Sequence, residues 1–309
     1  MFTCPPILPY FTPLPALSLQ GEANLGIPAW LAAVEADLDK ALASGTPIRQ
    51  VVMGRCCAID SMMAALFELY ELDQTDLTLF ATGGYGRGEL HPFSDVDLLL
   101  LSPNPIDEPL NQKISPFVAR LWDIGIDPAL VVRSVEECDE ACHDDITVAT
   151  SLLEARILAG NVAQAGLPMQ LLNKNWSQTK FYEAKMAEAK ERYLKHNSTE
   201  YNLEPDLKNA PGGLRDIHTV GWISKRYFRV TNLFGLVQQE FITEKEFDEL
   251  QEAEDFLWLI RHHLHKIAKR NENRVLFDYQ RLIAERIGYR DNSHPNAAVE
   301  HFMRDYYRY

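Results

Sequence analysis

The chain has 309 residues, of which 46% are hydrophobic, with 30 lysines and arginines against 44 aspartates and glutamates. This length and apolar content allow a substantial core and suggest more than one domain. The net charge of -14 argues against a nucleic-acid substrate, because nucleic-acid binders usually carry a basic surface. No apolar run reaches the roughly 20 residues that span a bilayer, so we expect no membrane contact.

The N-terminal region predicts an arm followed by two helices. Residues 1–25 are rich in proline and read as an extended arm without the basic start of a signal peptide. Pro28 suits the first turn of a helix that runs to Ala43, and an apolar stripe predicts a second helix from Ile48 to Leu72. The 5 cysteines lack zinc-like spacing, so we expect free thiols and a cytoplasmic protein.

Residues 83–97 combine a glycine-dense turn with two aspartates at i and i+2. Short apolar runs flank this stretch, which predicts the order strand, turn, strand. Asp95 and Asp97 then share one face of the second strand, where a divalent cation would relieve their mutual repulsion. Gly83 and Gly84 allow backbone N–H groups to approach a phosphate closely. Together these features indicate phosphoryl or nucleotidyl transfer.

Each feature alone also fits an ordinary turn or a chance pair of acids. Their combination in this order favours a functional site. The Gly-Lys-Ser/Thr triplet of a P-loop is missing after the turn, and Pro92 leaves no room for the long helix of a dinucleotide-binding fold.

The rest of the chain predicts one more strand and then helices. A helix ends near Trp122, and residues 126–133 read as a third strand that Pro128 restricts to a sheet edge or a bulge. Apolar periodicity predicts helices over 145–160, 178–197, 215–229, 243–270 and 278–288. The expected class is α+β, with an arm and helix at 1–45, a small sheet domain at 46–150 and an all-α helical domain at 151–309.

The string from Gly83 to Leu101 resembles the nucleotidyltransferase superfamily that contains DNA polymerase beta. It is similar in particular to the bacterial PII uridylyltransferase/uridylyl-removing enzymes. A second block, residues 201–218, supports this resemblance because it continues through Pro-Gly-Gly-Leu-Arg-Asp-Ile-His, which unrelated nucleotidyltransferases lack. The resemblance covers residues 60–309 and implies transfer of UMP from UTP to a tyrosine of the PII signalling protein, with Mg²⁺ as cofactor.

The resemblance also implies roles for individual residues. A third carboxylate should join Asp95 and Asp97 as a catalytic metal ligand, and Asp127 is the candidate. Relatives typically carry Glu and a Gly-His-Ser run there, whereas this chain has Asp127 followed by Pro128; the alternative is a solvated turn acid. The expected nucleotide contacts are Gly83, Gly84, Arg87, Ser94, Lys208, Arg215 and Asp216.

Several of these residues have an equally ordinary interpretation. Arg87 could simply be solvated, Ser94 could cap the turn, and Asp216 could stabilise the start of a helix. Two other functions also stay open. One is transfer of another nucleotide or to another acceptor, such as protein adenylylation. The other is a weakly active regulatory module that keeps the fold. The removal activity of the resembling family belongs to a separate phosphohydrolase domain, and the signature of that domain is not expected in this chain.

Overall fold

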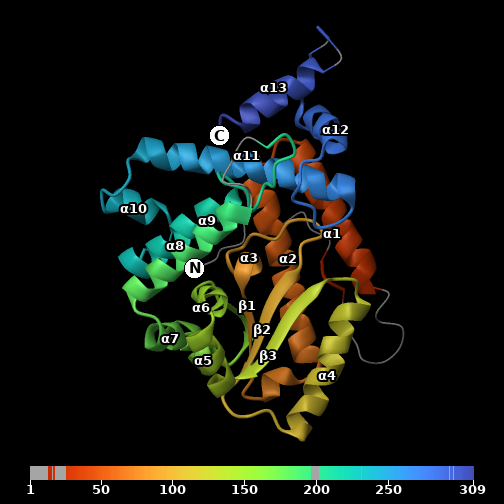
Figure 1. Ribbon diagram of the computed structural model, residues 1–309. Helices are drawn as coiled ribbons and strands as arrows, with labels where there is room; N and C mark the ends of the chain where they lie inside the picture. Colours follow the sequence, from red (N-terminus) through yellow and green to blue (C-terminus); the bar gives the residue numbers. More distant parts are fainter. Residues whose placement is uncertain are drawn as a thin grey trace. The chain divides into compact units, whose positions relative to one another are not determined.

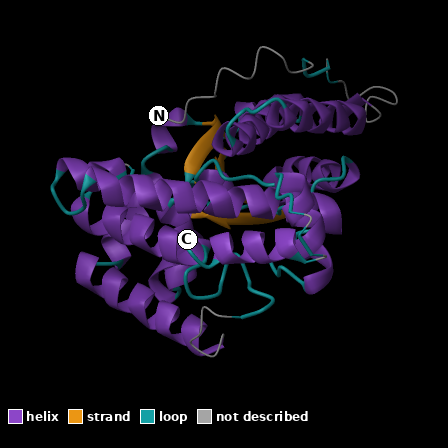
Figure 2. Cartoon of the chain, turned by 90° about the horizontal axis from the view of Figure 1, so that it is seen from above, coloured by secondary structure: helices purple, strands orange, loops and turns teal. Residues whose placement is uncertain are grey.

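The computed structural model describes residues 13–15, 17, 26–195, 202–230, 232–291, 293–294 and 296–309. It divides into two compact units, Met1–Trp176 and Ser177–Tyr309. Most described residues lie in helices, and the few strands form one small sheet (Figures 1 and 2). The class is therefore α+β, as the sequence predicts.

The sheet of the first unit has four strands in the order β3-β2-β1-β4. β1 pairs antiparallel with β2 and with β4, whereas β2 and β3 are parallel. The central position of β1 and β2 explains their composition, since a strand covered on both faces reads as a continuous apolar run, as in Leu98 to Leu101. The strands are β1 (Thr78–Ala81), β2 (Val96–Ser102), β3 (Pro128–Ser134) and β4 (Arg156–Gly160).

Helices surround this sheet. α2 packs against α1 and β4, and α5 packs against β2 and β3. The ring of Phe117 in α4 lies edge-on to Phe67 of α2, with 6.3 Å between centroids. The helices of the unit are α1 (Gly26–Ala43), α2 (Ile48–Leu69), α3 (Gly83–Gly86), α4 (Glu108–Asp123), α5 (Val135–Asp144), α6 (Ile146–Leu153) and α7 (Leu167–Asn175), with 3-10 turns at Leu72–Gln74 and Val162–Gln164.

Among the described residues, α2 is the one helix that is long and apolar enough to cross a membrane. Of its most apolar window, 67% is buried inside the structure. The core helix of a water-soluble fold meets the same criterion, so α2 is weak evidence for a membrane span.

The described part of the second unit consists of helices, their connections and one isolated bridge between Asp206 and Arg274. α11 packs against α9, α10 and α12, and α12 packs against α13. The helices are α8 (Gln178–Lys195), α9 (Leu214–Ile223), α10 (Phe234–Gln238), α11 (Glu244–Ala268), α12 (Phe277–Ile287) and α13 (Ala297–Tyr306), and a π-helical turn spans Ser224–Phe228.

Most predicted elements are confirmed, and one is wrong. The three predicted strands are present, and Pro128 begins an edge strand, where its missing N–H costs nothing. The predicted helix over 145–160 ends at Leu153, and the strand β4 follows it. Nearly all of the predicted N-terminal arm lies outside the described residues. The predicted domain boundary at 150 falls within the first unit.

The thiol prediction is confirmed in part. Cys56, Cys138 and Cys142 are free and buried. Cys57 is disulfide-bonded, contrary to the expectation.

Candidate active site

The parallel pairing of β2 with β3 brings the three predicted carboxylates to one end of the sheet. Val96 pairs with Pro128, and the Val96 N–H donates to the Asp127 carbonyl at 2.8 Å. Asp127 therefore lies beside Asp95, one step before the first pair of the ladder. Residues opposite each other on parallel strands share a face, as do residues two apart on one strand. Asp95, Asp97 and Asp127 consequently lie on the same face.

The three acids differ in exposure. Asp127 is exposed, whereas Asp95 and Asp97 are half-buried. The Asp127 carboxylate makes no hydrogen bond or ion pair with any residue that the structure describes. It is thus the member of the set that is most open to a ligand from solvent.

The glycine turn, which we define as residues 83–88, lies directly against Asp97. Gly83 has a φ of +53°, and a Cβ built on it would lie only 2.4 Å from Asp97 Oδ2. The Thr82 N–H before the turn donates to the Asp97 carbonyl at 3.0 Å. A side chain at Gly83 would displace the carboxylate, so the absence of one lets the turn and the acid meet.

The opposite side of the glycine turn is closed by protein. A Cβ on Gly86 would lie 2.3 Å from the Glu154 carbonyl oxygen. The Arg87 guanidinium donates to Glu154 and to Glu89, at 2.7 Å in each case. Burial alone would lower the pKa of Arg87, but the two carboxylates outweigh it and raise that pKa. A phosphate contact by Arg87 would need these ion pairs to open.

Ser94 stands between the glycine turn and the acids. Its Oγ is buried and has no hydrogen-bond partner among the described residues, although its N–H donates to the His91 carbonyl at 3.2 Å. The preceding Phe93 has a φ of +58°, which is rare for a bulky residue, and its ring is exposed. A buried hydroxyl without a partner is costly, so this Oγ is suited to a ligand oxygen.

These residues fit a divalent cation and a phosphate. Carboxylate oxygens are the ligands that Mg²⁺ prefers, and they share one sheet face beside a glycine turn and an unsatisfied hydroxyl. Asp95, Asp97 and Asp127 could hold the ion.

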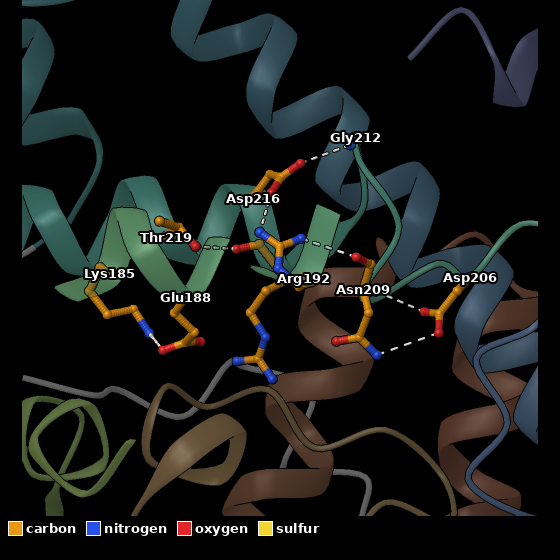
Figure 3. A network of polar contacts seen from close by, with 9 residues as sticks. Lys185, Glu188, Arg192, Asp206, Asn209, Gly212, Asp216 and Thr219 are labelled. Atoms are coloured by element: carbon orange, nitrogen blue, oxygen red, sulfur yellow. Dashed lines mark hydrogen bonds and ion pairs between the residues drawn. The ribbon is translucent and has the colours of Figure 1, made fainter. Parts of the chain in front are cut away.

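The second sequence block folds as a turn that Asp216 and Arg192 of α8 hold (Figure 3). Asp216, in the first turn of α9, accepts from Arg192 at 2.6 Å and from the Gly212 N–H at 2.8 Å. Arg192 also donates to the Asn209 carbonyl at 3.1 Å. Both oxygens of the Asp216 carboxylate are therefore engaged within the second unit.

Lys208 and Arg215 are neighbours in this block. The Arg215 N–H donates to the Lys208 carbonyl at 2.8 Å, and the Arg215 guanidinium lies over the Trp222 ring, 5.2 Å from its centroid. The backbone contact brings two cationic residues together. Tyr201, the first residue of the block, lies outside the described residues.

Sequence reasoning missed Asp60, Glu154 and Arg156, which pack behind the glycine turn. Arg156 donates to both oxygens of Asp60, at 2.7 and 3.1 Å, and to the Tyr85 carbonyl at 3.3 Å. No motif marks these residues in the sequence, because their partners lie 67 to 96 positions away.

Comparison with known families agrees with this geometry. A model described as a nucleotidyltransferase domain matches residues 64–150, which contain Asp95, Asp97, Asp127 and the glycine turn. The chain therefore carries a nucleotidyltransferase domain. A second model, described as GlnD PII-uridylyltransferase, matches residues 180–309.

Similar proteins define the family more closely. A bifunctional uridylyltransferase/uridylyl-removing enzyme of Psychrobacter sp. (strain PRwf-1) is 59% identical over 100% of this chain and 35% of its own length. The corresponding enzyme of Psychrobacter arcticus is 55% identical over 100% of this chain and 36% of its own length. The corresponding enzyme of Acinetobacter baumannii is 49% identical over 90% of this chain and 32% of its own length. The chain belongs to this family of enzymes and spans about a third of the length of these relatives.

Proposed function

We propose that this protein transfers UMP from UTP to a tyrosine hydroxyl of the PII signal-transduction protein and releases pyrophosphate, in nitrogen regulation in the cytoplasm. The observation that carries the proposal is the common face of Asp95, Asp97 and Asp127 beside the glycine turn. The uridylyl group and the PII acceptor are supported by the similarity to uridylyltransferases and to the PII-uridylyltransferase model.

In the proposed reaction the tyrosine oxygen attacks the α-phosphorus of UTP. A bond forms between these two atoms, and the bond from the α-phosphorus to the α–β bridging oxygen breaks, so that pyrophosphate leaves with the electron pair. The hydroxyl proton passes to the Asp127 carboxylate, which is the exposed member of the set. Such a transfer is governed by positioning and by stabilisation of charge on the phosphate oxygens.

The remaining residues of the site bind and orient the nucleotide. Backbone N–H groups at Gly83 and Gly84 and the Ser94 hydroxyl donate to phosphate oxygens. Asp95, Asp97 and Asp127 would hold Mg²⁺. When bound, this ion supplies positive charge that offsets the negative charge of the phosphates.

The second unit is proposed as the helical domain of the PII-uridylyltransferase type. Within it, Lys208 and Arg215 are proposed to contact the nucleotide, because phosphate recognition needs cations and these two lie next to each other. Asp216 supports them by fixing the turn that carries them. Arg87 is proposed to act in the same indirect way in the first unit.

A transfer assay with labelled UTP, PII and Mg²⁺ tests the proposal. Asp95→Asn and Asp97→Asn should each lower the rate by about 10²-fold or more and leave thermal unfolding nearly unchanged, because each removes charge that acts on the transition state. Asp73→Asn, an exposed acid of the same unit, is the matched control and should retain the rate. Normal rates for both site variants would refute the site assignment.

The choice of nucleotide needs its own measurement. Equilibrium binding of UTP, ATP, CTP and GTP in the presence of Mg²⁺ should show the tightest binding for UTP. A clear preference for ATP would instead favour adenylylation. Binding of UTP without transfer to any acceptor would favour a regulatory module, since Asp127 is one methylene shorter than the Glu of the resembling family.

A further inference from the structure

Two ion-paired arginines hold the glycine turn: Arg156 comes from β4, and Arg87 belongs to the turn itself. Arg156, the first residue of β4, joins Asp60 of α2 to the Tyr85 carbonyl, and its guanidinium lies 5.5 Å from the centroid of the Tyr85 ring. Arg87, at the end of α3, is pinned between Glu154 and Glu89. We propose that Asp60, Arg87, Glu154 and Arg156 are positioning residues that set the glycine turn for nucleotide binding. This inference rests on the function proposed above.

Three consecutive residues of the turn meet the segment 154–156. The Tyr85 carbonyl accepts from Arg156, the Cα of Gly86 faces the Glu154 carbonyl, and the Arg87 side chain binds the Glu154 carboxylate. The turn is therefore fixed at backbone and side-chain level by one short segment. Glu154 and Arg156 lie at the junction between α6 and β4.

The ion pairs and hydrogen bonds around the glycine turn are largely buried, so water does not compete strongly with them. The side chain of Glu154 is 2% exposed and that of Arg87 is 14% exposed. Tyr85 is 1% exposed, and burial, together with the neighbouring Asp60, raises its pKa. Arg156 binds both oxygens of Asp60, and such a fork fixes an orientation as well as a distance. Arg87 makes one hydrogen bond to each of its two carboxylates.

The turn cannot set its own geometry. α3 has only four residues, and helices of that length are unstable in isolation. Gly83 has a positive φ and borders the carboxylate of Asp97. The direction of the N–H groups proposed to meet the phosphates therefore depends on contacts from outside the turn. A shift of about 1 Å at such a site can cost on the order of 10²-fold in rate.

Replacing arginine by lysine tests the proposal, because lysine keeps the positive charge but cannot form the two-pronged contact that arginine makes with a carboxylate. Arg156→Lys keeps the charge but loses the fork to Asp60 and the contact with Tyr85. We expect the equilibrium dissociation constant for UTP with Mg²⁺ to rise about tenfold, which is 1.4 kcal/mol. Arg87→Lys should act in the same direction. The dissociation constant is measured at a temperature where thermal unfolding shows every variant to be fully folded, because unfolded chains would raise its apparent value. Under that condition a merely structural role would leave the dissociation constant unchanged.

Arg120→Lys is the matched control. Arg120 donates to the Tyr70 hydroxyl at 2.8 Å in the same unit, remote in sequence from the turn. This variant should bind UTP as the wild type does. Asp60→Asn, which keeps the shape of its side chain, provides a second variant if Arg156→Lys does not fold, and it should weaken UTP binding likewise. Combined with Arg156→Lys, it should add little further loss, because both changes break one contact.

The outcomes separate the two hypotheses. If the wild type binds UTP and the Arg156, Arg87 and Asp60 variants bind it equally well, the positioning role is refuted and the proposed function stands. If the wild type binds no nucleotide, the proposed function fails first. A tenfold loss in the variants with an unchanged Arg120 control supports the inference.

Discussion

Each unit contains a glycine turn, and the side chains around the two turns are used differently. In the turn of residues 83–88, ion pairs lie behind the backbone, and the acids in front are directed to one sheet face. At the turn of residues 211–213, the nearest acid, Asp216, accepts hydrogen bonds from Arg192 and from the Gly212 N–H. The first arrangement leaves the Asp127 carboxylate without a hydrogen bond or ion pair to any described residue, whereas the second uses its carboxylate to hold the backbone.

This difference explains why similar sequence signals differ in meaning. In both turns a Gly-Gly pair is followed within the next residues by Arg and Asp, and each turn leads into a regular element, β2 in the first unit and α9 in the second. What separates them is the register of β3 on β2, which places Asp127 beside Asp95 in the first unit. Substitutions at the two turns should therefore affect activity in one case and stability in the other.

The largest effect is expected from Gly83→Ala. Its Cβ would collide with Asp97 Oδ2, so we expect transfer activity to fall by about 10²-fold or more, with a smaller loss of stability from the positive φ. Gly125→Ala is the control, since Gly125 also has a positive φ but nothing lies within 4 Å of its Cβ position. Activity and urea unfolding would be measured for both. Equal loss of activity in the two variants would contradict the special role of Gly83.

Gly86→Ala should lower stability as well as transfer activity, because it displaces the turn that is proposed to bind the nucleotide. Its Cβ would lie 2.3 Å from a backbone oxygen, which cannot move as a side chain would, so we expect a loss of about 1–3 kcal/mol in the free energy of unfolding. Gly213→Ala in the second turn meets two backbone oxygens at 2.9 Å and should lose a similar amount of stability, with a smaller effect on transfer. Urea unfolding measures both. Wild-type stability for Gly86→Ala would mean that the turn is not packed against Glu154.

Asp216→Asn distinguishes the second turn from the first. The change removes the charged partner of Arg192, and we expect a loss of about 1–3 kcal/mol in stability, because a partly buried charge loses its partner. The dissociation constant for UTP should change less than in Lys208→Met. A loss of transfer as large as that of Asp97→Asn, at full stability, would show that the two turns share the chemistry.

The smallest effect concerns two matching capping boxes, one in each unit. Hydrogen bonds from Ser134 lower the pKa of Glu137 at the start of α5, and those from Thr243 lower the pKa of Glu246 at the start of α11. Each carboxylate therefore stabilises the fold above pH 4.5, and the contribution disappears as pH falls through the lowered folded-state pKa.

We expect Glu137→Gln and Glu246→Gln to reduce the thermal midpoint slightly at pH 6. On acidification the thermal midpoint of each variant should fall by less than that of the wild type. Glu252→Gln, an exposed acid of α11 outside both capping boxes, provides a comparison. A change at pH 6 that persists unaltered at pH 3 would contradict the assigned cause.

Much of the site-bearing sheet could be predicted from the sequence. Residues 77–101 gave a local pattern of apolar strand, glycine turn and apolar strand, and Asp95 and Asp97 share a face simply because strands alternate. Asp216 was likewise expected in the first turn of a helix, which is where α9 places it. These features depend on neighbours in the chain.

The rest depends on distant partners. β4 was read as the end of a helix because Arg156 to Gly160 continues an apolar segment after only a two-residue break, and its strand form comes from pairing with β1. The sequence predicts a phosphate contact for Arg87, since its partner Glu154 lies 67 positions away and no local pattern reveals the ion pair. Local composition does not reveal which residue a side chain will meet across a sheet.

The pairing of Thr78 with Gly160 has a consequence for biosynthesis. The glycine turn is translated well before Glu154 and Arg156, so a nascent chain carries the turn without the residues that later fix it. Contacts so distant in sequence form slowly, since a long loop must close first. The strand β1 would meanwhile expose an open edge on the side that β4 later covers. A ribosome paused before residue 154 should therefore display a chain that is prone to misassociation and in need of chaperones.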